Sequence, residues 1–515
     1  MRITSIFLII CFLSGFTLAQ VDTKSTAQKL DTYFTGLAND LELHGSVLVA
    51  EDGKIIYEKS FGYADVEARK LNTRDTEFQL ASIAKPFTAI AVLQLKEKGK
   101  LNLDHKFVKY FPNFPYPDIT IRHLLSHTSG LSDYELFSKL IELNPDKVYE
   151  NKDIIPVMIS MKVPLEFQPG EKWDYRNFNF SLLALLVEKL SGQKFEDYLK
   201  KNVFEPAKMT NTYVKTALIN PTPSPNYAYN HVYPFLFSSE PVSINKKFTN
   251  PRFKRYLYNQ GFIGDSNVYS TTGDLLKFDQ ALYNAVLLKN ETLEESMTPA
   301  KLNSGEDDKI PPGPGGKGIG GMGNASNGLG WMIFDDASAG KIVWHAGGTS
   351  GAVTIFFRNV TKKQTVVVLD NTYNLTLYPK ALSAMHILNG KPILPVKKSL
   401  AKIYGRTLIA QGAESAAVRL NEFKADTENY TLVEREFNNM AWDMMMNGYK
   451  TQALEAFKIN TFLFPASDHI YGSYGEGLLE IGKKEEAIIM FNKALKINPN
   501  NDDAKKMLKK IESEK

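Results

Sequence analysis

The sequence has almost no cysteine: Cys11 is the only one in 515 residues. It lies within the first 20 residues, MRITSIFLIICFLSGFTLAQ, where one arginine precedes a short apolar stretch and small residues near Ala19. This pattern is typical of a secretory signal peptide, so we predict that residues 1–19 are removed and that the protein is secreted or periplasmic. The mature chain would have no thiol, which excludes disulfide bonds, thiolate catalysis and cysteine metal sites. An uncleaved anchor is the alternative, although the apolar stretch is short for a membrane span.

A strong charge imbalance is also missing. The 61 basic and 57 acidic side chains leave a net charge of +4, which is small for this length. We therefore expect no nucleic-acid partner, and no membrane span after signal cleavage. At 515 residues the chain is too long for one ordinary domain, and two or three are expected.

Residues 20–390 read as one α+β unit, because strand signals stand at both ends and helical signals between them. Two β-rich runs flank the turn Glu51-Asp52-Gly53, which predicts a hairpin. Predicted helices cover 25–42, 84–95, 180–190 and 378–388; predicted strands cover 46–50, 54–60, 341–344, 353–357 and 365–369. The Gly- and Pro-rich stretch 311–323 predicts a flexible loop.

The segment KPILPVKK, residues 391–398, predicts a linker, and no strand signal follows it. In the C-terminal part, 399–515, Gly448, Ala453, Phe457 and Pro465 recur 34 residues later as Gly482, Ala487, Phe491 and Pro499. A fixed period of this kind indicates helical repeats, and YGSYGEGLLEIGKKEEAIIMFNKALKINPNN resembles a tetratricopeptide repeat. We therefore predict an all-α repeat domain with a possible protein or peptide partner. Unrelated helices with chance spacing are the alternative.

Three short motifs carry the chemistry. In LASIAKPFTA, Ser82 and Lys85 are one helical turn apart, and Pro86 indicates that the helix begins close to Ser82. The spacing alone is weak evidence, because Ser-x-x-Lys also begins at Ser191, Ser243, Ser338 and Ser399. Ser82 differs from these in preceding a buried helix.

The other motifs are Tyr175-Arg176-Asn177 and His345-Ala346-Gly347. Tyr175 and Asn177 follow a Pro-Gly turn and can point the same way from an extended segment. His345 joins two strand-like runs, and glycines beside it allow a ligand to approach the backbone. Taken alone, each motif is more commonly a surface loop or a packed histidine.

Together, in this order, Ser-x-x-Lys, Tyr-x-Asn and His-x-Gly resemble the serine β-lactamase-related superfamily, in the branch of class C β-lactamases, DD-peptidases and related esterases. The phrases ITIRHLLSHTSGL and GLGW agree, and the resemblance covers residues 25–390. It implies an antiparallel sheet flanked by helices, an all-helical lobe and an active site between them. The implied reaction is acyl transfer to Ser82 and hydrolysis of a D-amino-acid peptide, a β-lactam or a small ester, without metal or cofactor.

The resemblance also implies roles for individual residues. Lys85 would be the base, with a pKa lowered by burial. Tyr175 would relay protons, with its pKa lowered beside cations, and His345 would orient substrate or assist Tyr175 near neutral pH. The backbone N–H groups of Ser82 and Gly348 would form the oxyanion hole. Asn177 would be catalytic too, holding Lys85 and hydrogen-bonding the substrate amide. Substrate-binding residues would be Asn177, His345, Gly347 and Thr349.

Other sites and functions remain open. His123 and His127 are four apart, a metal-like spacing, but no third ligand is apparent. Ser350 in GTSGA narrowly misses a nucleophile-elbow motif. Asp265, Ser266 and Asp274 match a family segment near the cleft and receive no catalytic role. As alternatives to an active hydrolase, the chain could be a catalytically weak penicillin-recognising or peptide-binding sensor, or its repeats a packing lid.

Overall fold

The computed structural model describes residues 23–144, 147–216, 224–244, 261–311, 325–336, 340–374 and 376–513. The predicted signal peptide, most of the predicted loop at 311–323 and Ser338 lie outside the described residues. Among the helices that are described, none combines the length and apolar character of a membrane span.

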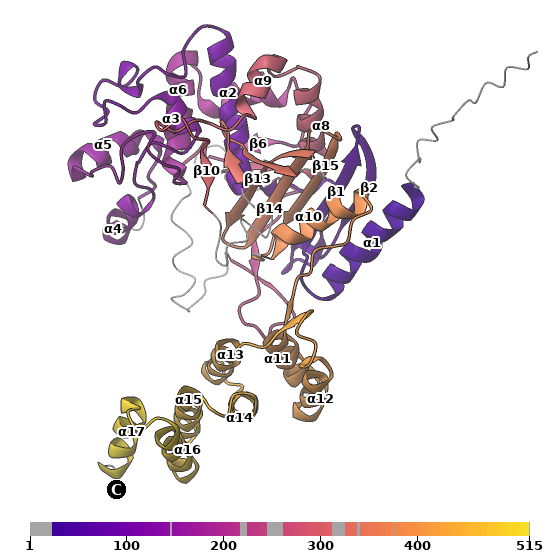
Figure 1. Cartoon of the computed structure of the whole chain (residues 1–515), viewed down its shortest axis with the longest axis vertical. Helices are drawn as coiled ribbons and strands as arrows, with labels where there is room; N and C mark the ends of the chain where they lie inside the picture. Colours follow the sequence, from indigo (N-terminus) through magenta and orange to yellow (C-terminus); the bar gives the residue numbers. More distant parts are fainter. Residues whose placement is uncertain are drawn as a thin grey trace, which may run out of the picture.

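An eight-stranded antiparallel sheet forms the centre of the molecule (Figure 1). Its strands, in spatial order, are β10 (Lys309–Ile310), β11 (Ala325–Asn327), β12 (Met332–Asp336), β13 (Gly340–Thr349), β14 (Ala352–Asn359), β15 (Gln364–Asp370), β1 (Gly45–Glu51) and β2 (Lys54–Ser60). The N-terminal hairpin β1–β2 therefore pairs with β15, which follows it by some 300 residues, and the unit closes on itself as predicted.

Alternation along the strands divides the core between the two faces of the sheet. Val47 and Val49 of β1 belong to the cluster that also contains residues of α1 (Thr23–Asn39) and α10 (Leu377–Leu388). Leu48 and Ala50 belong to the larger cluster on the opposite face. Because successive side chains of a strand point to opposite faces, β1, whose central residues 47–50 are all apolar, is covered on both sides.

The larger cluster joins the sheet to an all-helical lobe, seen at the upper left of Figure 1. The remaining helices of this unit are α2 (Ala84–Glu97), α3 (Ile121–Leu125), α4 (Glu135–Leu143), α5 (Asn151–Met161), α6 (Asn177–Ser191), α7 (Phe195–Leu199), α8 (Thr272–Tyr283) and α9 (Asn290–Ser296). Helices α2 and α6 pack against each other and are apolar nearly all round, which suits helices buried on every side.

Several short strands complete the unit. They are β3 (Tyr63–Asp65), β4 (Lys70–Leu71), β5 (Phe78–Gln79), β6 (Tyr213–Val214), β7 (His231–Val232), β8 (Val242–Ser243) and β9 (Val268–Ser270). Strand β9 lies between β5 and β6, and so brings residues near 79, 213 and 269 together.

The predicted elements are present with small shifts at their ends. Glu51, expected in the hairpin turn, is the last residue of β1, and the turn consists of Asp52 and Gly53, both with positive φ. This is the conformation that a two-residue loop requires between twisted strands. Strand β13 extends well beyond the predicted 341–344, to Thr349, because it pairs with β14 along its length.

Beyond residue 399 the chain is almost entirely helical. The helices are α11 (Leu400–Gln411), α12 (Ala413–Phe423), α13 (Glu434–Met446), α14 (Lys450–Leu463), α15 (Asp468–Leu479), α16 (Lys484–Ile497) and α17 (Asp502–Ser513). Helices α13, α15 and α17 begin at 434, 468 and 502, each 34 residues after the last. The assignment to tetratricopeptide repeats and the boundary at 391–398 stay predictions.

This C-terminal helical region contacts the sheet-containing unit through the hairpin β7–β8. Phe237, beyond β7, is buried in one cluster with Tyr404 of α11 and Met440 of α13. The carboxylate of Glu42 forms ion pairs with both Lys380 of α10 and Lys402 of α11. The hairpin and this ion-pair bridge therefore join the two parts.

Candidate active site

Ser82 lies in a 3₁₀ turn, Ala81–Ile83, between β5 and α2. Ala81 before it has φ of +48°, a left-handed conformation that residues with a Cβ rarely adopt. The turn is held by β14 and β13: the hydroxyl of Thr354 donates to the Leu80 carbonyl at 2.7 Å, and the Cα of Gly347 packs on the same carbonyl. The strained backbone is thus fixed by its neighbours, and the Ser82 hydroxyl faces a pocket.

Lys85 is fully buried one turn further on, and its ammonium group has three acceptors. Nζ lies 3.0 Å from Ser82 Oγ, 2.9 Å from Asn177 Oδ1 and 3.0 Å from the backbone oxygen of Asp265. Two of these acceptors, the amide oxygen and the backbone oxygen, have no hydrogen to donate. When Lys85 is neutral and keeps bonds to both, its lone pair therefore points at Ser82.

The surroundings of Lys85 favour that neutral form. Burial lowers the pKa of its amine to about 8, although the carboxylates of Asp265 and Asp133 oppose the shift. Its ammonium also lies 4.8 Å from the centre of the Tyr175 ring. The predicted lowering of the Lys85 pKa therefore has its stated cause, loss of hydration.

Asp133 holds Asn177 in the orientation that Lys85 requires. One carboxylate oxygen of Asp133 accepts from the backbone N–H of Asn177 at 2.9 Å and from its Nδ2 at 2.8 Å. Its other oxygen accepts from the Phe178 N–H, so Asp133 caps α6, whose own N-cap residue makes no capping side-chain hydrogen bond. Burial raises the pKa of Asp133 to about 6. Because Nδ2 is bound to a carboxylate, Oδ1 is the atom left for Lys85.

Asp265 is the second buried acid of the site. Its carboxylate accepts hydrogen bonds from the hydroxyls of Tyr134 and Ser181, while its backbone oxygen accepts from Lys85. Asp274, in the same sequence segment, pairs with Lys277 instead and does not line the pocket. Asp265 therefore positions the Lys85 amine through its backbone oxygen, and its carboxylate charge raises the pKa of that amine.

The expectation that the pKa of Tyr175 falls beside cations is wrong. Burial raises the pKa of its phenol well above the usual range, and the carboxylates of Asp265 and Asp133 raise it further. A hydrogen bond with Ser82 lowers it only in part. The ring of Tyr175 also stacks on His127, with centroids 4.3 Å apart. Tyr175 is therefore a neutral phenol that can donate a hydrogen bond.

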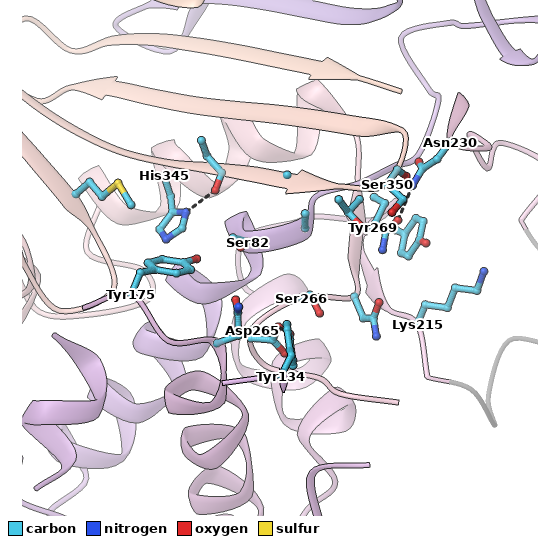
Figure 2. A pocket seen from close by; sticks show the side chains of 18 of the residues that line it. Ser82, Tyr134, Tyr175, Lys215, Asn230, Asp265, Ser266, Tyr269, His345 and Ser350 are labelled. Atoms are coloured by element: carbon cyan, nitrogen blue, oxygen red, sulfur yellow. Dashed lines mark hydrogen bonds between the residues drawn. The ribbon is translucent and has the colours of Figure 1, made fainter. Parts of the chain in front are cut away.

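The predicted task of His345, to orient substrate or to assist Tyr175 near neutral pH, falls to a neutral imidazole. Burial, and then the charge of Lys85, lower the pKa of its imidazole to about 3. Its Nδ1 lies 2.8 Å from the backbone oxygen of Ala346, which can only accept, so Nδ1 carries the hydrogen (Figure 2). The other ring nitrogen is then an acceptor. His345 offers the site a lone pair and no positive charge.

The end of β13 lines the pocket beside Ser82. Gly348 and Thr349 are lining residues, and a Cβ placed on Gly348 would meet nothing within 4 Å. Gly347, expected to bind substrate, does not line the pocket, because a Cβ there would lie 2.1 Å from the Leu80 backbone oxygen. It is needed for the close packing of β13 on the turn that holds Ser82.

The pocket has a volume of about 690 Å³ and contains Ser82, Tyr175, Asn177 and His345 in its lining (Figure 2). Ser350 also lines it, at the turn after β13, but no base contacts its hydroxyl among the hydrogen bonds described. His123 and His127 each accept a backbone N–H through Nδ1. In the described ranges no group of three or more potential ligands could hold a metal ion.

The arrangement can activate a hydroxyl for attack on a carbonyl. Five side chains predicted from motifs up to 263 positions apart come together here: Ser82, Lys85, Tyr175, Asn177 and His345. Asp133 and Asp265 were not predicted to take part. Two observations could have indicated Asp133: it lies two residues beyond the phrase ITIRHLLSHTSGL, and a buried lysine needs acceptors nearby.

The chain is similar to known proteins over the same residues. A family model described as Beta-lactamase matches residues 31–384. Penicillin-binding protein 4* of Bacillus subtilis (strain 168) is 35% identical over 365 residues, which are 70% of this chain and 76% of that protein.

Two solved structures are also similar. The penicillin-binding protein from Bacillus halodurans has a TM-score of 0.56 and 27% identity, covering 69% of this chain and 99% of the other. The octameric penicillin-binding protein homologue from Pyrococcus abyssi has a TM-score of 0.58 and 25% identity, and the match covers 71% of this chain and 77% of the other.

Proposed function

Because the chain belongs to the Beta-lactamase family and is a serine hydrolase of that family, we propose that it transfers an acyl group from an amide or ester to Ser82 and then to water. The observation that carries this proposal is the set of three contacts around Lys85 Nζ, which aims the lone pair of its neutral amine at Ser82 Oγ. A serine hydroxyl needs such a base to become a nucleophile.

In acylation, neutral Lys85 accepts the Ser82 proton while Oγ forms a bond to the substrate carbonyl carbon. The carbonyl electron pair moves to oxygen, and the backbone N–H groups of Ser82 and Gly348 donate to this oxyanion. On collapse the bond to the leaving group breaks. The leaving amine or alkoxide takes a proton from the phenol of Tyr175. The Lys85 ammonium then donates a proton to the Tyr175 oxygen, so the phenol is restored.

In deacylation the same groups act in reverse. A water molecule takes the place of the leaving group, gives a proton to Lys85 through Tyr175, and attacks the ester carbonyl. The acyl–oxygen bond breaks and the Ser82 oxygen recovers its proton. No step requires Tyr175 to ionise fully, which suits a phenol whose pKa is raised.

Covalent labelling tests this proposal. A fluorophosphonate or a fluorescent penicillin should add once to the wild type, and peptide mass spectrometry should locate the adduct on Ser82. Ser82→Ala should abolish labelling, whereas Ser350→Ala and Ser266→Ala, which alter other pocket serines, should keep it. An adduct on Ser350, or ligand binding without any adduct, would refute the assignment.

For the substrate, we infer a D-amino-acid peptide or a small ester in preference to a β-lactam. The named relatives are penicillin-binding proteins. A neutral His345 stands where class C β-lactamases resembling this chain have a lysine. The same neutrality favours a second candidate, a penicillin-recognising sensor with a long-lived acyl-enzyme. Multiple turnovers of a D-Ala-D-Ala peptide or an ester by wild type, absent in Ser82→Ala, would exclude the sensor.

We also propose that the protein acts outside the cytoplasm, in the cell envelope or as a secreted protein, supported by the signal-like sequence before residue 20. Mass spectrometry of the N-terminus after expression with export would test cleavage near Ala19. The C-terminal helical region is proposed to bind a protein or peptide. None of the described pocket-lining residues comes from beyond 378, which argues against a lid over the pocket.

A further inference from the structure

The pocket around Ser82 extends in two directions with different chemistry (Figure 2). Beside Tyr175 and His345 its lining is aromatic and apolar, with Trp173, Met332, Trp344 and Tyr378. On the opposite side of Ser82 the lining is polar, with Gln79, Lys215, Tyr227, Asn230 and Tyr269. The mechanism proposed above uses no residue of this second, polar end.

Lys215 is the positive charge of the polar end. Its backbone N–H donates to the Asn267 backbone oxygen at 2.8 Å, which fixes the start of its side chain. Its Nζ lies 4.5 Å from the centre of the Tyr227 ring and 5.5 Å from that of Tyr269, and donates to the Tyr227 hydroxyl at 3.4 Å. Among the residues described, no carboxylate pairs with it, so most of its hydrogen-bonding capacity is unused.

The neighbours of Lys215 are fixed, and they offer hydrogens. The hydroxyls of Tyr227 and Tyr269 lie 3.3 Å apart, and burial holds the pKa of Tyr269 well above its usual range, so it stays a neutral phenol. Asn230 donates through Nδ2 to the side-chain oxygen of Gln79 at 2.8 Å. That bond leaves the NH₂ group of Gln79 as its remaining hydrogen-bonding group.

The remaining charges of the lining do not neutralise Lys215. Asp265 is the carboxylate among the described lining residues, and its oxygens already accept from Tyr134 and Ser181. His345 is neutral, and Lys85 is sealed beneath Ser82 with no exposed surface. The polar end is therefore a cationic, donor-rich recess that suits a carboxylate.

The proton path indicates which part of the substrate reaches this recess. Tyr175 gives its proton to the leaving group, so the leaving group lies at the aromatic end. The acyl group must then extend past Ser82 to the polar end. Resting on the proposed acyl transfer, we propose that Lys215, with Tyr227 and Tyr269, binds a carboxylate in the acyl part of the substrate. The enzyme then prefers acyl donors that carry a free carboxylate away from the reacting carbonyl.

Half-esters of dicarboxylic acids test this preference. The mono-4-nitrophenyl esters of adipic, suberic and sebacic acid carry the carboxylate at increasing distance, and their methyl esters at that carboxyl are matched neutral controls. For the best length, we expect wild type to favour the anionic ester at least tenfold in kcat/KM. The preference should fall as salt is raised from about 0.05 M to 0.5 M, because screening weakens charge pairs.

Substitutions at Lys215 assign the preference to this residue. Lys215→Met, similar in length, should reduce the ratio of anionic to neutral kcat/KM about tenfold, and Lys215→Glu should invert it. Lys215→Arg should keep it in part. The control Lys106→Met removes an exposed lysine outside the pocket, paired with Asp118, and should leave the ratio unchanged. Equal ratios in wild type and Lys215→Met would overturn the subsite while leaving the hydrolase intact.

A binding measurement separates the subsite from catalysis. In Ser82→Ala, the fluorescence of Trp173 and Trp344, which line the pocket, should respond to monomethyl suberate at lower concentration than to dimethyl suberate. Adding Lys215→Met should remove this difference. If wild type hydrolyses no ester but this difference persists, the proposed reaction fails and the subsite stands; no difference between the two ligands would overturn the subsite.

Discussion

Replacing Asp265 by asparagine should move the pH dependence of the reaction to lower pH. The substitution removes a negative charge that raises the pKa of Lys85, while the contact with Lys85 Nζ is made by the backbone oxygen and is retained. The side chain accepts from two hydroxyls, Tyr134 and Ser181, and hydroxyls can also accept from an asparagine NH₂. The charge can therefore be removed with little loss of hydrogen bonding.

The magnitude follows from the pKa of Lys85. A fall from 10.5 to about 8 raises the neutral fraction at pH 7 from about one in 3,000 to about one in ten. A nearby carboxylate raises the pKa of an amine by about 1–3 units, and the hydrogen bonds already made by Asp265 favour the lower end. In Asp265→Asn the pKa of Lys85 should thus fall to about 7. Because the neutral amine is the base, kcat/KM should rise with pH and level off about one unit earlier than in wild type.

The assay is kcat/KM for a neutral 4-nitrophenyl ester between pH 5.5 and 9.5, corrected for spontaneous hydrolysis, with thermal unfolding to check the fold. Asp308→Asn is the matched control, because Asp308 is also a fully buried acid but is not among the charges that act on the pKa of Lys85. If the pH midpoint of kcat/KM stays at about 8 in Asp265→Asn, or rises, the reasoning is refuted: either Lys85 is not the base, or the charge of Asp265 does not raise its pKa.

Three further predictions concern stability. Burial raises the pKa of Asp308 from 3.8 to about 7, so ionisation of this carboxyl in the native state opposes folding above pH 7 and does not oppose it below pH 4. Asp308→Asn should therefore add about 4 kcal/mol of unfolding free energy at pH 8 and little at pH 4, and equal effects at the two pH values would contradict this. Asp279→Asn should cost about 3–5 kcal/mol in urea unfolding, because it leaves the Arg358 charge buried and unpaired, whereas Asp31→Asn, in an exposed pair with Lys59, should cost less than 1 kcal/mol. Phe237→Ala removes a ring that is buried against α11 and α13, so it should speed amide hydrogen exchange in these helices and proteolysis at 391–398. The control Phe462→Ala alters a residue that is 69% exposed and should change neither rate. Unchanged exchange in Phe237→Ala would show that the hairpin does not hold the helical region.

The fold was predictable where one local signal decided the element. Asp52-Gly53 gave the hairpin, the apolar stretch from Ala84 gave α2, and the strands near 343, 355 and 367 were placed by their β-branched runs. The extent of β13 was not predictable, because Gly347 and Gly348 near its end are poor strand formers. They are extended only because β14 pairs with them and the Ser82 turn packs on Gly347.

The site was predictable where a motif was contiguous, and not where residues meet only through topology. Ser82 and Lys85 could be predicted to lie together because they are one helical turn apart. Tyr175 and His345 were predicted from the resemblance to a known family. Lys215, Tyr227 and Tyr269 carry no shared sequence pattern. The pairing of β9 with β6 brings Tyr269 near Lys215, and a bridge between Glu77 and Tyr227 places Tyr227 near the start of β5. Their relation to Ser82 follows from the pocket, which the sequence does not describe.

The wrong pKa expectation for Tyr175 and the neutrality of His345 have one cause, and it bears on the mechanism. From the sequence, Tyr175 was judged by its proximity to the cation of Lys85, and His345 by its ordinary pKa. In the fold His345 is buried and Tyr175 is largely removed from solvent, and the carboxylates of Asp133 and Asp265 act on Tyr175 as well. Burial disfavours every charged form, so it raises the neutral share of the lysine at pH 7 to about one in ten, keeps the histidine neutral and keeps the tyrosine protonated. The same desolvation therefore makes Lys85 the base, Tyr175 a proton donor and His345 an acceptor, and no separate device is required for each role.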